Sequence, residues 1–145
     1  MILADEQATT ALGGAIARVL RAGDVICLSG PLGVGKTSLA RAMLAARGHM
    51  GEVPSPTFAI VQPYDALDPP LWHVDLYRLE DVAEMAELGL DAIGDDGVLI
   101  VEWPERAGAA AWPDALRLSL AFDGPTARRL TAGVPAAWEG RWPPR

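Results

Sequence analysis

The order of apolar and polar positions predicts a chain in which strands and helices alternate. Short, nearly continuous apolar runs at 24–29 and 98–102 are typical of strands buried on both faces of a parallel sheet. Apolar residues recur every three or four positions over 5–21, 38–47 and 79–88, which predicts three helices. This order is typical of an α/β domain.

Further strands are predicted where apolar and polar residues alternate. Residues 71–76 and 116–120 follow this pattern, so each is expected to form a strand with one buried face. The second is expected at an edge of the sheet, paired antiparallel with 128–130 across a tight turn. Two prolines within 52–58 exclude a helix and predict a stiff loop that enters a strand at 58–61.

A single domain is predicted, because 145 residues with 50% hydrophobic content suit one core. The domain is expected to span 1–132. The remaining segment, 133–145, is rich in alanine, proline and tryptophan and is expected to be loosely ordered. Two roles stay open for Trp138 and Trp142, which either pack back on the domain or contact a partner.

The stretch from Gly30 to Thr37 carries the clearest chemistry. It reads Gly-Pro-Leu-Gly-Val-Gly-Lys-Thr between a predicted strand and a predicted helix, as the P-loop pattern requires. Glycines let backbone N–H groups turn towards a phosphate at a helix N-terminus. Lys36, the one lysine in the chain, would bind the β- and γ-phosphates, and the Thr37 hydroxyl would hold Mg²⁺. The nucleotide-binding residues expected here are Gly30, Leu32, Gly33, Val34, Gly35, Lys36, Thr37 and Ser38.

Two other strands are expected to bring side chains to the same place. The run that ends in Glu102 fits the Walker B pattern, in which a buried parallel strand delivers a carboxylate at its tip. Glu102 would then join Thr37 at Mg²⁺ or order a water molecule. His73 and Asp75 share one face of the strand at 71–76, and a structural or a functional role is equally consistent with their spacing.

Composition narrows the class of ligand and partner. A net charge of −7 and a pI near 4.7 argue against direct binding to a phosphate backbone. The single cysteine, Cys27, excludes an intrachain disulfide and is expected to pack as a small apolar group. A secretion signal and a membrane-spanning apolar run are not visible, so a cytoplasmic protein that does not contact a membrane is expected.

The nucleotide is expected to be ATP. Guanine-specific P-loop proteins use an Asn-Lys-x-Asp motif, but this chain has no asparagine and its one lysine lies in the P-loop. A small-molecule kinase would need an arginine-bearing lid, and no long insertion of that kind is apparent.

Four motifs together resemble the TsaE (YjeE) family, the ATPase of bacterial tRNA threonylcarbamoyladenosine (t6A) biosynthesis. They are the P-loop, Ser-Pro-Thr-Phe at 55–58, His-Val-Asp-Leu-Tyr-Arg-Leu at 73–79 and Glu-Trp-Pro-Glu-Arg at 102–106, and the resemblance extends to about Thr131. It implies a P-loop NTPase fold with a parallel core sheet, flanking antiparallel strands and helices on both faces. ATP and Mg²⁺ are the implied cofactors.

The resemblance also implies a function and partners. The chain would be a weak ATPase that acts with the TsaD–TsaB complex, which modifies tRNA, so that contact with tRNA is indirect. ATP hydrolysis would reset that complex between turnovers. Two alternatives stay open: a nucleotide-dependent binding module in which hydrolysis is not required, and a P-loop small-molecule kinase.

Residue roles follow from the same resemblance. Lys36, Asp75 and Glu102 are the implied catalytic residues, and Thr37 and Glu102 are the implied Mg²⁺ ligands. A switch-like loop is implied at Ser55 and Thr57. The residues implied to lie near the rest of the nucleotide are Glu6, Thr10, Trp103 and Arg128.

One position in the P-loop departs from the family, which often has an acid where this chain has Pro31. That side chain can point away from the phosphates, so nucleotide binding is expected to survive. Arg78 and Arg106 are candidates to act on the γ-phosphate. A slow enzyme that a partner completes is expected, because P-loop enzymes without a positioned arginine are about 10³–10⁵-fold slower.

Overall fold

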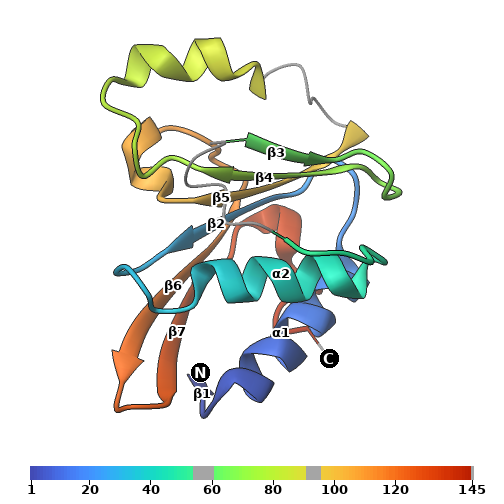
Figure 1. Cartoon of the computed structure of the whole chain (residues 1–145), viewed down its shortest axis with the longest axis vertical. Helices are drawn as coiled ribbons and strands as arrows, with labels where there is room; N and C mark the ends of the chain where they lie inside the picture. The colour runs from blue at the N-terminus through green and yellow to red at the C-terminus, as the bar shows by residue number, and fades with distance from the viewer. Residues whose placement is uncertain (54–60, 91–95, 145) are drawn as a thin grey trace.

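A computed structural model describes residues 1–53, 61–90 and 96–144. These residues form one seven-stranded sheet (Figure 1). Its strands are β1 (Ile2–Leu3), β2 (Val25–Ser29), β3 (Val61–Tyr64), β4 (Leu71–Asp75), β5 (Val98–Glu102), β6 (Leu116–Asp123) and β7 (Ala127–Gly133). Their order across the sheet is β1-β7-β6-β2-β5-β4-β3.

The centre of the sheet is parallel and its margins are antiparallel. Strand β2 pairs in parallel with both β5 and β6, and β4 pairs in parallel with β5. Strands β3, β7 and β1 are added antiparallel at the two sides. This is the α/β P-loop NTPase fold that the sequence and its resemblance predict.

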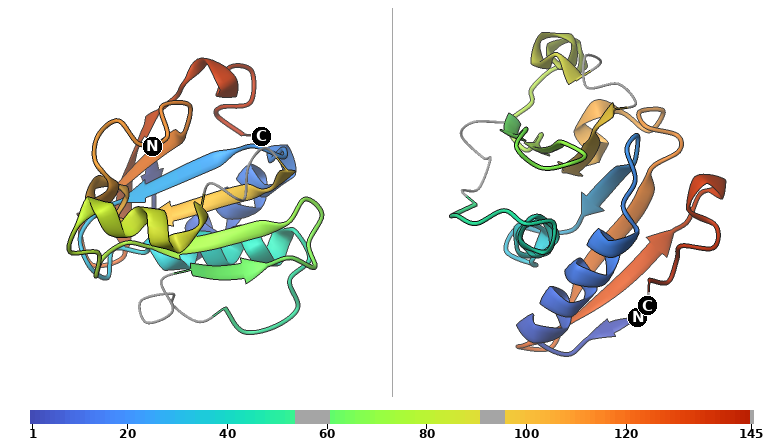
Figure 2. Two further views of the ribbon diagram at one scale, coloured as in Figure 1. Left: turned by 90° about the horizontal axis from the view of Figure 1, so that it is seen from above. Right: turned by 90° about the vertical axis from the view of Figure 1, so that its right-hand side faces the viewer.

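Helices cover both faces of the sheet, but the two α-helices share one face. Helices α1 (Glu6–Val19) and α2 (Lys36–Ala46) lie beside each other over the central strands (Figures 1 and 2). The other face is covered by the 3₁₀ helices η1 (Val82–Leu88) and η4 (Pro104–Ala107). Within β5, Ile100 packs towards the α-helices, whereas Leu99 and Val101 pack towards η1 and η4. Alternation within a fully buried strand thus divides the core into two clusters.

Two predicted elements differ from the structure, and a third lies largely outside the described residues. The helix expected over 79–88 is the 3₁₀ helix η1. The strand at 116–120 was expected at an edge but is internal, because it pairs in parallel with β2 on one side and antiparallel with β7 on the other. The strand expected at 58–61 lies outside the described residues except for Val61, where β3 begins.

The C-terminal segment is packed against the domain, in contrast to the loosely ordered tail that was expected. Trp138 ends the 3₁₀ helix η5 (Ala136–Trp138) and is 1% exposed within the core cluster of α1 and α2. Trp142 packs against the same cluster. Arg141 is held by Asp24 at 2.7 Å and 3.0 Å and by the carbonyls of Val19 and Ala137. A buried ion pair and a buried ring fix this segment; a proline- and alanine-rich composition indicated neither.

Along the described ranges, none of the helices has both the length and the apolar composition needed to cross a bilayer.

Adjacent glycines in α1 should respond oppositely to alanine. A Cβ at Gly13 would lie 2.4 Å from the Cβ of Ala42 in α2, whereas a Cβ at Gly14 would meet no atom closer than 3.9 Å. We expect Gly13→Ala to lower the free energy of unfolding by about 1–3 kcal/mol, because it separates the two helices. Gly14→Ala should raise it by about 0.5–1 kcal/mol, as alanine favours the helix. Urea unfolding measures both, and equal effects would contradict this packing.

The buried ion pair of the C-terminal segment should contribute far more than an exposed one. Arg141→Ala leaves the Asp24 carboxylate buried without its partner, so we expect a loss of about 3–5 kcal/mol in the free energy of unfolding. The control is Arg129→Ala, which removes an exposed contact of 3.8 Å to Asp123 and should cost about 0–1 kcal/mol. Thermal unfolding that gave both variants the same midpoint would argue against a packed C-terminal segment.

Candidate functional site

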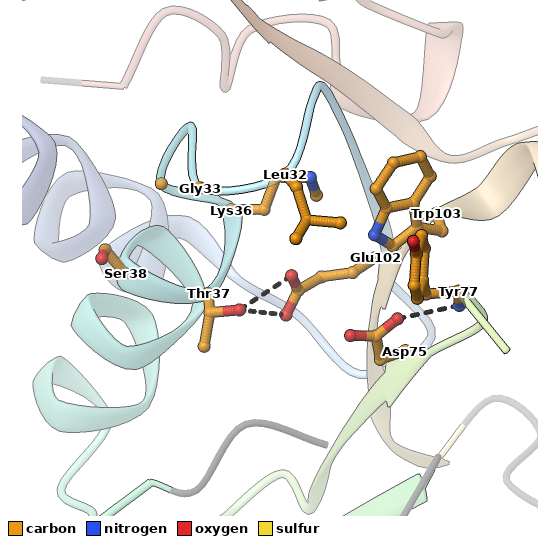
Figure 3. A pocket seen from close by; sticks show the side chains of 10 residues that line it. Leu32, Gly33, Lys36, Thr37, Ser38, Asp75, Tyr77, Glu102 and Trp103 are labelled. Carbon is orange, nitrogen blue, oxygen red and sulfur yellow. Dashed lines mark hydrogen bonds between the residues drawn. The ribbon is translucent and has the colours of Figure 1, made fainter. Parts of the chain in front are cut away.

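A cavity of about 290 Å³ opens where the carboxyl ends of β2, β4 and β5 meet the first turn of α2 (Figure 3). Ligands of open α/β sheets bind at such strand ends. The cavity brings together the predicted P-loop, Asp75 from β4, and Glu102 and Trp103 at the end of β5. Its lining residues are Leu32, Gly33, Gly35, Lys36, Thr37, Ser38, Asp75, Tyr77, Glu102 and Trp103.

Two glycines of the loop are required for different reasons. Gly30 has a φ of 145°, and a Cβ there would lie 2.5 Å from the carbonyl oxygen of Leu120, so the loop can turn close to β6 only as glycine. Gly35 precedes α2 with a φ of 117° in open space, so its constraint is conformational. Pro31 is exposed and does not line the cavity, in keeping with a side chain that points away.

Lys36 is buried at the start of α2. Its ammonium donates to the carbonyls of Gly30 at 2.5 Å and Pro31 at 3.0 Å, and it lies 4.4 Å from the centre of the Trp103 ring. Burial lowers the pKa of Lys36, and the nearby carboxylates of Glu102 and Asp75 oppose that shift. The ammonium is therefore held at the loop by its own carbonyls and by an aromatic face, where an anion can compete for it.

Glu102 joins the sheet to the loop through Thr37. The Thr37 hydroxyl lies 2.9 Å and 3.0 Å from the two carboxylate oxygens of Glu102. The Nε2 atom of His73, on the neighbouring strand, lies 2.6 Å from Oε2 of Glu102. All three side chains come from different elements, and Glu102 and His73 are almost completely buried. The sequence left the role of His73 open, and the structure places its ring in the buried interior, in contact with the carboxylate of Glu102.

Asp75 lies beside Glu102, because the parallel register of β4 and β5 pairs these two residues. Its Oδ1 accepts a hydrogen bond of 2.9 Å from the backbone N–H of Tyr77. The cavity thus has two carboxylates on adjacent strand ends, both facing α2 (Figure 3).

Aromatic rings form the remaining wall. Trp103 has a φ of 58°, which is unusual for a residue other than glycine, and its backbone N–H donates to the carbonyl of Leu28 in β2 at 3.2 Å. Its ring centre lies 5.0 Å from that of Tyr77, and the Arg106 guanidinium lies 5.8 Å from the Tyr77 ring. Tyr77 lies in the motif at 73–79 but was not expected at the site, although it follows Asp75 by two residues.

A smaller pocket of about 90 Å³ lies on the other side of the loop, between α1 and β7. It contains two of the residues implied to lie near the base, Glu6 and Arg128, and Arg128 donates to the carbonyl of Val34 at 2.9 Å. Thr10 is exposed and does not line it, whereas Thr9 does. Helical periodicity could have separated them, because Thr9 lies three residues before the buried Leu12. Ser55 and Thr57 lie outside the described residues.

The oxygen atoms of Thr37 and Glu102 suit Mg²⁺, a hard cation that in nucleotide sites takes one or two protein ligands and completes its shell with phosphates and water. Within the described ranges, there is no cluster of three or more His, Cys, Asp or Glu residues that could hold a metal alone. A hydroxyl and a carboxylate within 3.0 Å of each other are the donor set expected for an ion that arrives with a nucleotide.

Comparisons with known proteins identify the family of the chain. Residues 3–130 match the family model described as threonylcarbamoyl adenosine biosynthesis protein TsaE. Proteins named tRNA threonylcarbamoyladenosine biosynthesis protein TsaE are 46% identical in Streptomyces coelicolor, over 75% of this chain and 76% of that protein, and 40% identical in Haemophilus influenzae, over 63% and 58%. The crystal structure of Bacillus subtilis YdiB superposes with a TM-score of 0.78 at 26% identity, covering 97% of this chain and 88% of that one. The chain belongs to the TsaE family.

Proposed function

We propose that this chain is a magnesium-dependent ATPase that serves tRNA t6A formation in the cytoplasm. The names of its relatives support the part in t6A formation. The observation that carries the proposal is the convergence of Lys36, Thr37, Asp75 and Glu102 on one cavity at the carboxyl ends of three parallel strands. No other arrangement in the described residues combines a phosphate-binding loop with two carboxylates.

Each residue has a distinct task in this proposal. The P-loop N–H groups and Lys36 bind the phosphates, while Thr37 and Glu102 hold Mg²⁺, which neutralises charge that develops on the phosphoryl group. Asp75, fixed by the N–H of Tyr77, orients the attacking water or accepts its proton. The smaller pocket with Glu6, Thr9 and Arg128 takes the rest of the nucleotide.

Hydrolysis by the chain alone is proposed to be slow. None of the described residues that line the cavity is an arginine. The guanidinium of Arg106 instead lies 5.8 Å from the centre of the Tyr77 ring. A TsaD–TsaB complex would supply an arginine or reposition Arg78 or Arg106 onto the phosphates. ATP hydrolysis would then allow that complex multiple turnovers, and contact with tRNA would be made through the complex.

Replacement of the P-loop lysine should abolish nucleotide binding and leave the fold intact. Lys36→Ala removes the ammonium but no part of the main apolar core, so we expect ATP binding to fall below detection in calorimetry while circular dichroism stays unchanged. The matched control is Arg41→Ala, which removes an exposed cation of the same helix and should bind ATP as the unmodified chain does. Loss of the folded signal in Lys36→Ala would contradict the assigned role.

The function itself is tested by ATP turnover with and without partners. The purified chain should hydrolyse ATP slowly, and a TsaD–TsaB complex with tRNA should stimulate it by roughly 10³-fold or more if an arginine is supplied or repositioned. An unchanged rate in the presence of tightly bound ATP would favour a nucleotide-dependent binding module instead. Phosphoryl transfer to a metabolite without any protein partner would favour a small-molecule kinase.

Asp75→Ala separates hydrolysis from binding. We expect it to bind ATP but to support only a single round of t6A formation, measured as product per complex. Repeated product formation by this variant would show that hydrolysis is not the function of the chain.

A further inference from the structure

The carboxylate of Glu102 sits between two side chains that contact it differently. Thr37 lies 2.9 Å from one oxygen and 3.0 Å from the other, so the hydroxyl holds the carboxylate without selecting a rotation about its last bond. That torsion is broad for a glutamate. His73 contacts Oε2 alone, at 2.6 Å. Of the two side chains, only His73 therefore distinguishes one carboxylate oxygen of Glu102 from the other.

We propose that His73 is a positioning residue, which fixes Oε2 of Glu102 from below so that Oε1 and the Thr37 hydroxyl are presented together to Mg²⁺. This inference rests on the proposed Mg²⁺-dependent binding of ATP. His73 does not line the cavity, so it acts through Glu102 and does not touch the nucleotide.

The hydrogen-bond partners of His73 identify which of its ring nitrogens donates. A carboxylate only accepts hydrogen bonds, so the Nε2 atom of His73 carries the proton in the contact with Glu102. The Nδ1 atom is buried and has no partner among the described residues. The ring is thus suited to donate one hydrogen bond in one direction.

The strand geometry explains why a residue at position 73 can do this. In the parallel register of β4 and β5, Asp75 lies opposite Glu102 and His73 lies opposite Ile100. His73 and Asp75 point to the same side of the sheet because they are two residues apart. Asp75 therefore lies level with the carboxylate at the cavity, and His73 lies one step deeper, where it is 0% exposed. The contact is shielded from bulk solvent, so its direction is preserved.

The test uses ATP binding by the full chain, measured by calorimetry in EDTA and across a series of Mg²⁺ concentrations. His73→Leu fills the space without a donor. We expect it to bind ATP normally in EDTA but to need about 10–100-fold more Mg²⁺ for the same enhancement of affinity, which is the usual effect of losing a group that orients a metal ligand. His73→Gln retains an N–H near the position of Nε2 and should restore most of the enhancement.

Two controls separate positioning from structure. His73→Asn carries its amide near the position of Nδ1, cannot reach Glu102, and should behave as His73→Leu does. Leu71→Ala removes a buried side chain from the same strand and should lower the thermal midpoint without changing the Mg²⁺ requirement. An unchanged Mg²⁺ requirement in His73→Leu, or a Gln variant as defective as the Asn variant, would overturn the inference.

A crystal structure of the nucleotide-free His73→Asn variant tests the inference even if ATP does not bind. We expect Glu102 to adopt more than one rotation or to leave Thr37. A single orientation identical to that in the unmodified chain would overturn the role of His73. Failure of the unmodified chain to bind Mg²⁺ with ATP would instead overturn the proposed function, so the two failures are distinguishable.

Discussion

The parallel pairing of β5 with both β2 and β4 is the constraint on which the site depends. It places the ends of three strands at one edge of the sheet, so that the phosphate loop, Asp75 and Glu102 arrive together although they are far apart in the sequence. The register matters because a shift of one residue in β5 would turn Glu102 to the other face of the sheet, away from Thr37 and His73. The position of each carboxylate is thus a property of the whole sheet.

Close approaches between neighbouring elements hold the end of the sheet at which the cavity opens. The P-loop passes close to β6 at Gly30, and α1 packs closely on α2 at Gly13. The backbone N–H of Trp103 donates a hydrogen bond to a carbonyl of β2. Each contact fixes the distance between two elements that carry site residues. The small pocket beside α1 and the main cavity beside α2 share Gly33, Gly35 and Ser38, so the two helices together set the space in which a nucleotide would lie.

Much of this arrangement could be predicted from the sequence, because local patterns determine it. The P-loop glycines, the apolar run that ends in Glu102 and the period of α1 each specify an element and its exposed or buried side. What could not be predicted depends on contacts distant in sequence. The internal place of β6 follows from its pairing with β2, the proposed role of His73 follows from the register with β5, and the burial of Arg141 follows from Asp24, 117 residues away.

The anchoring of Arg141 has a practical consequence for how the molecule can be handled. Asp24, which holds it, lies just before β2, whereas the phosphate loop begins at the other end of that strand. Five strand residues separate the two ends by about 16 Å. A fluorophore, affinity handle or surface tether joined after the anchored segment is therefore attached near the amino end of β2, and the cavity lies at its carboxyl end. Immobilisation through that end keeps the cavity open to solution.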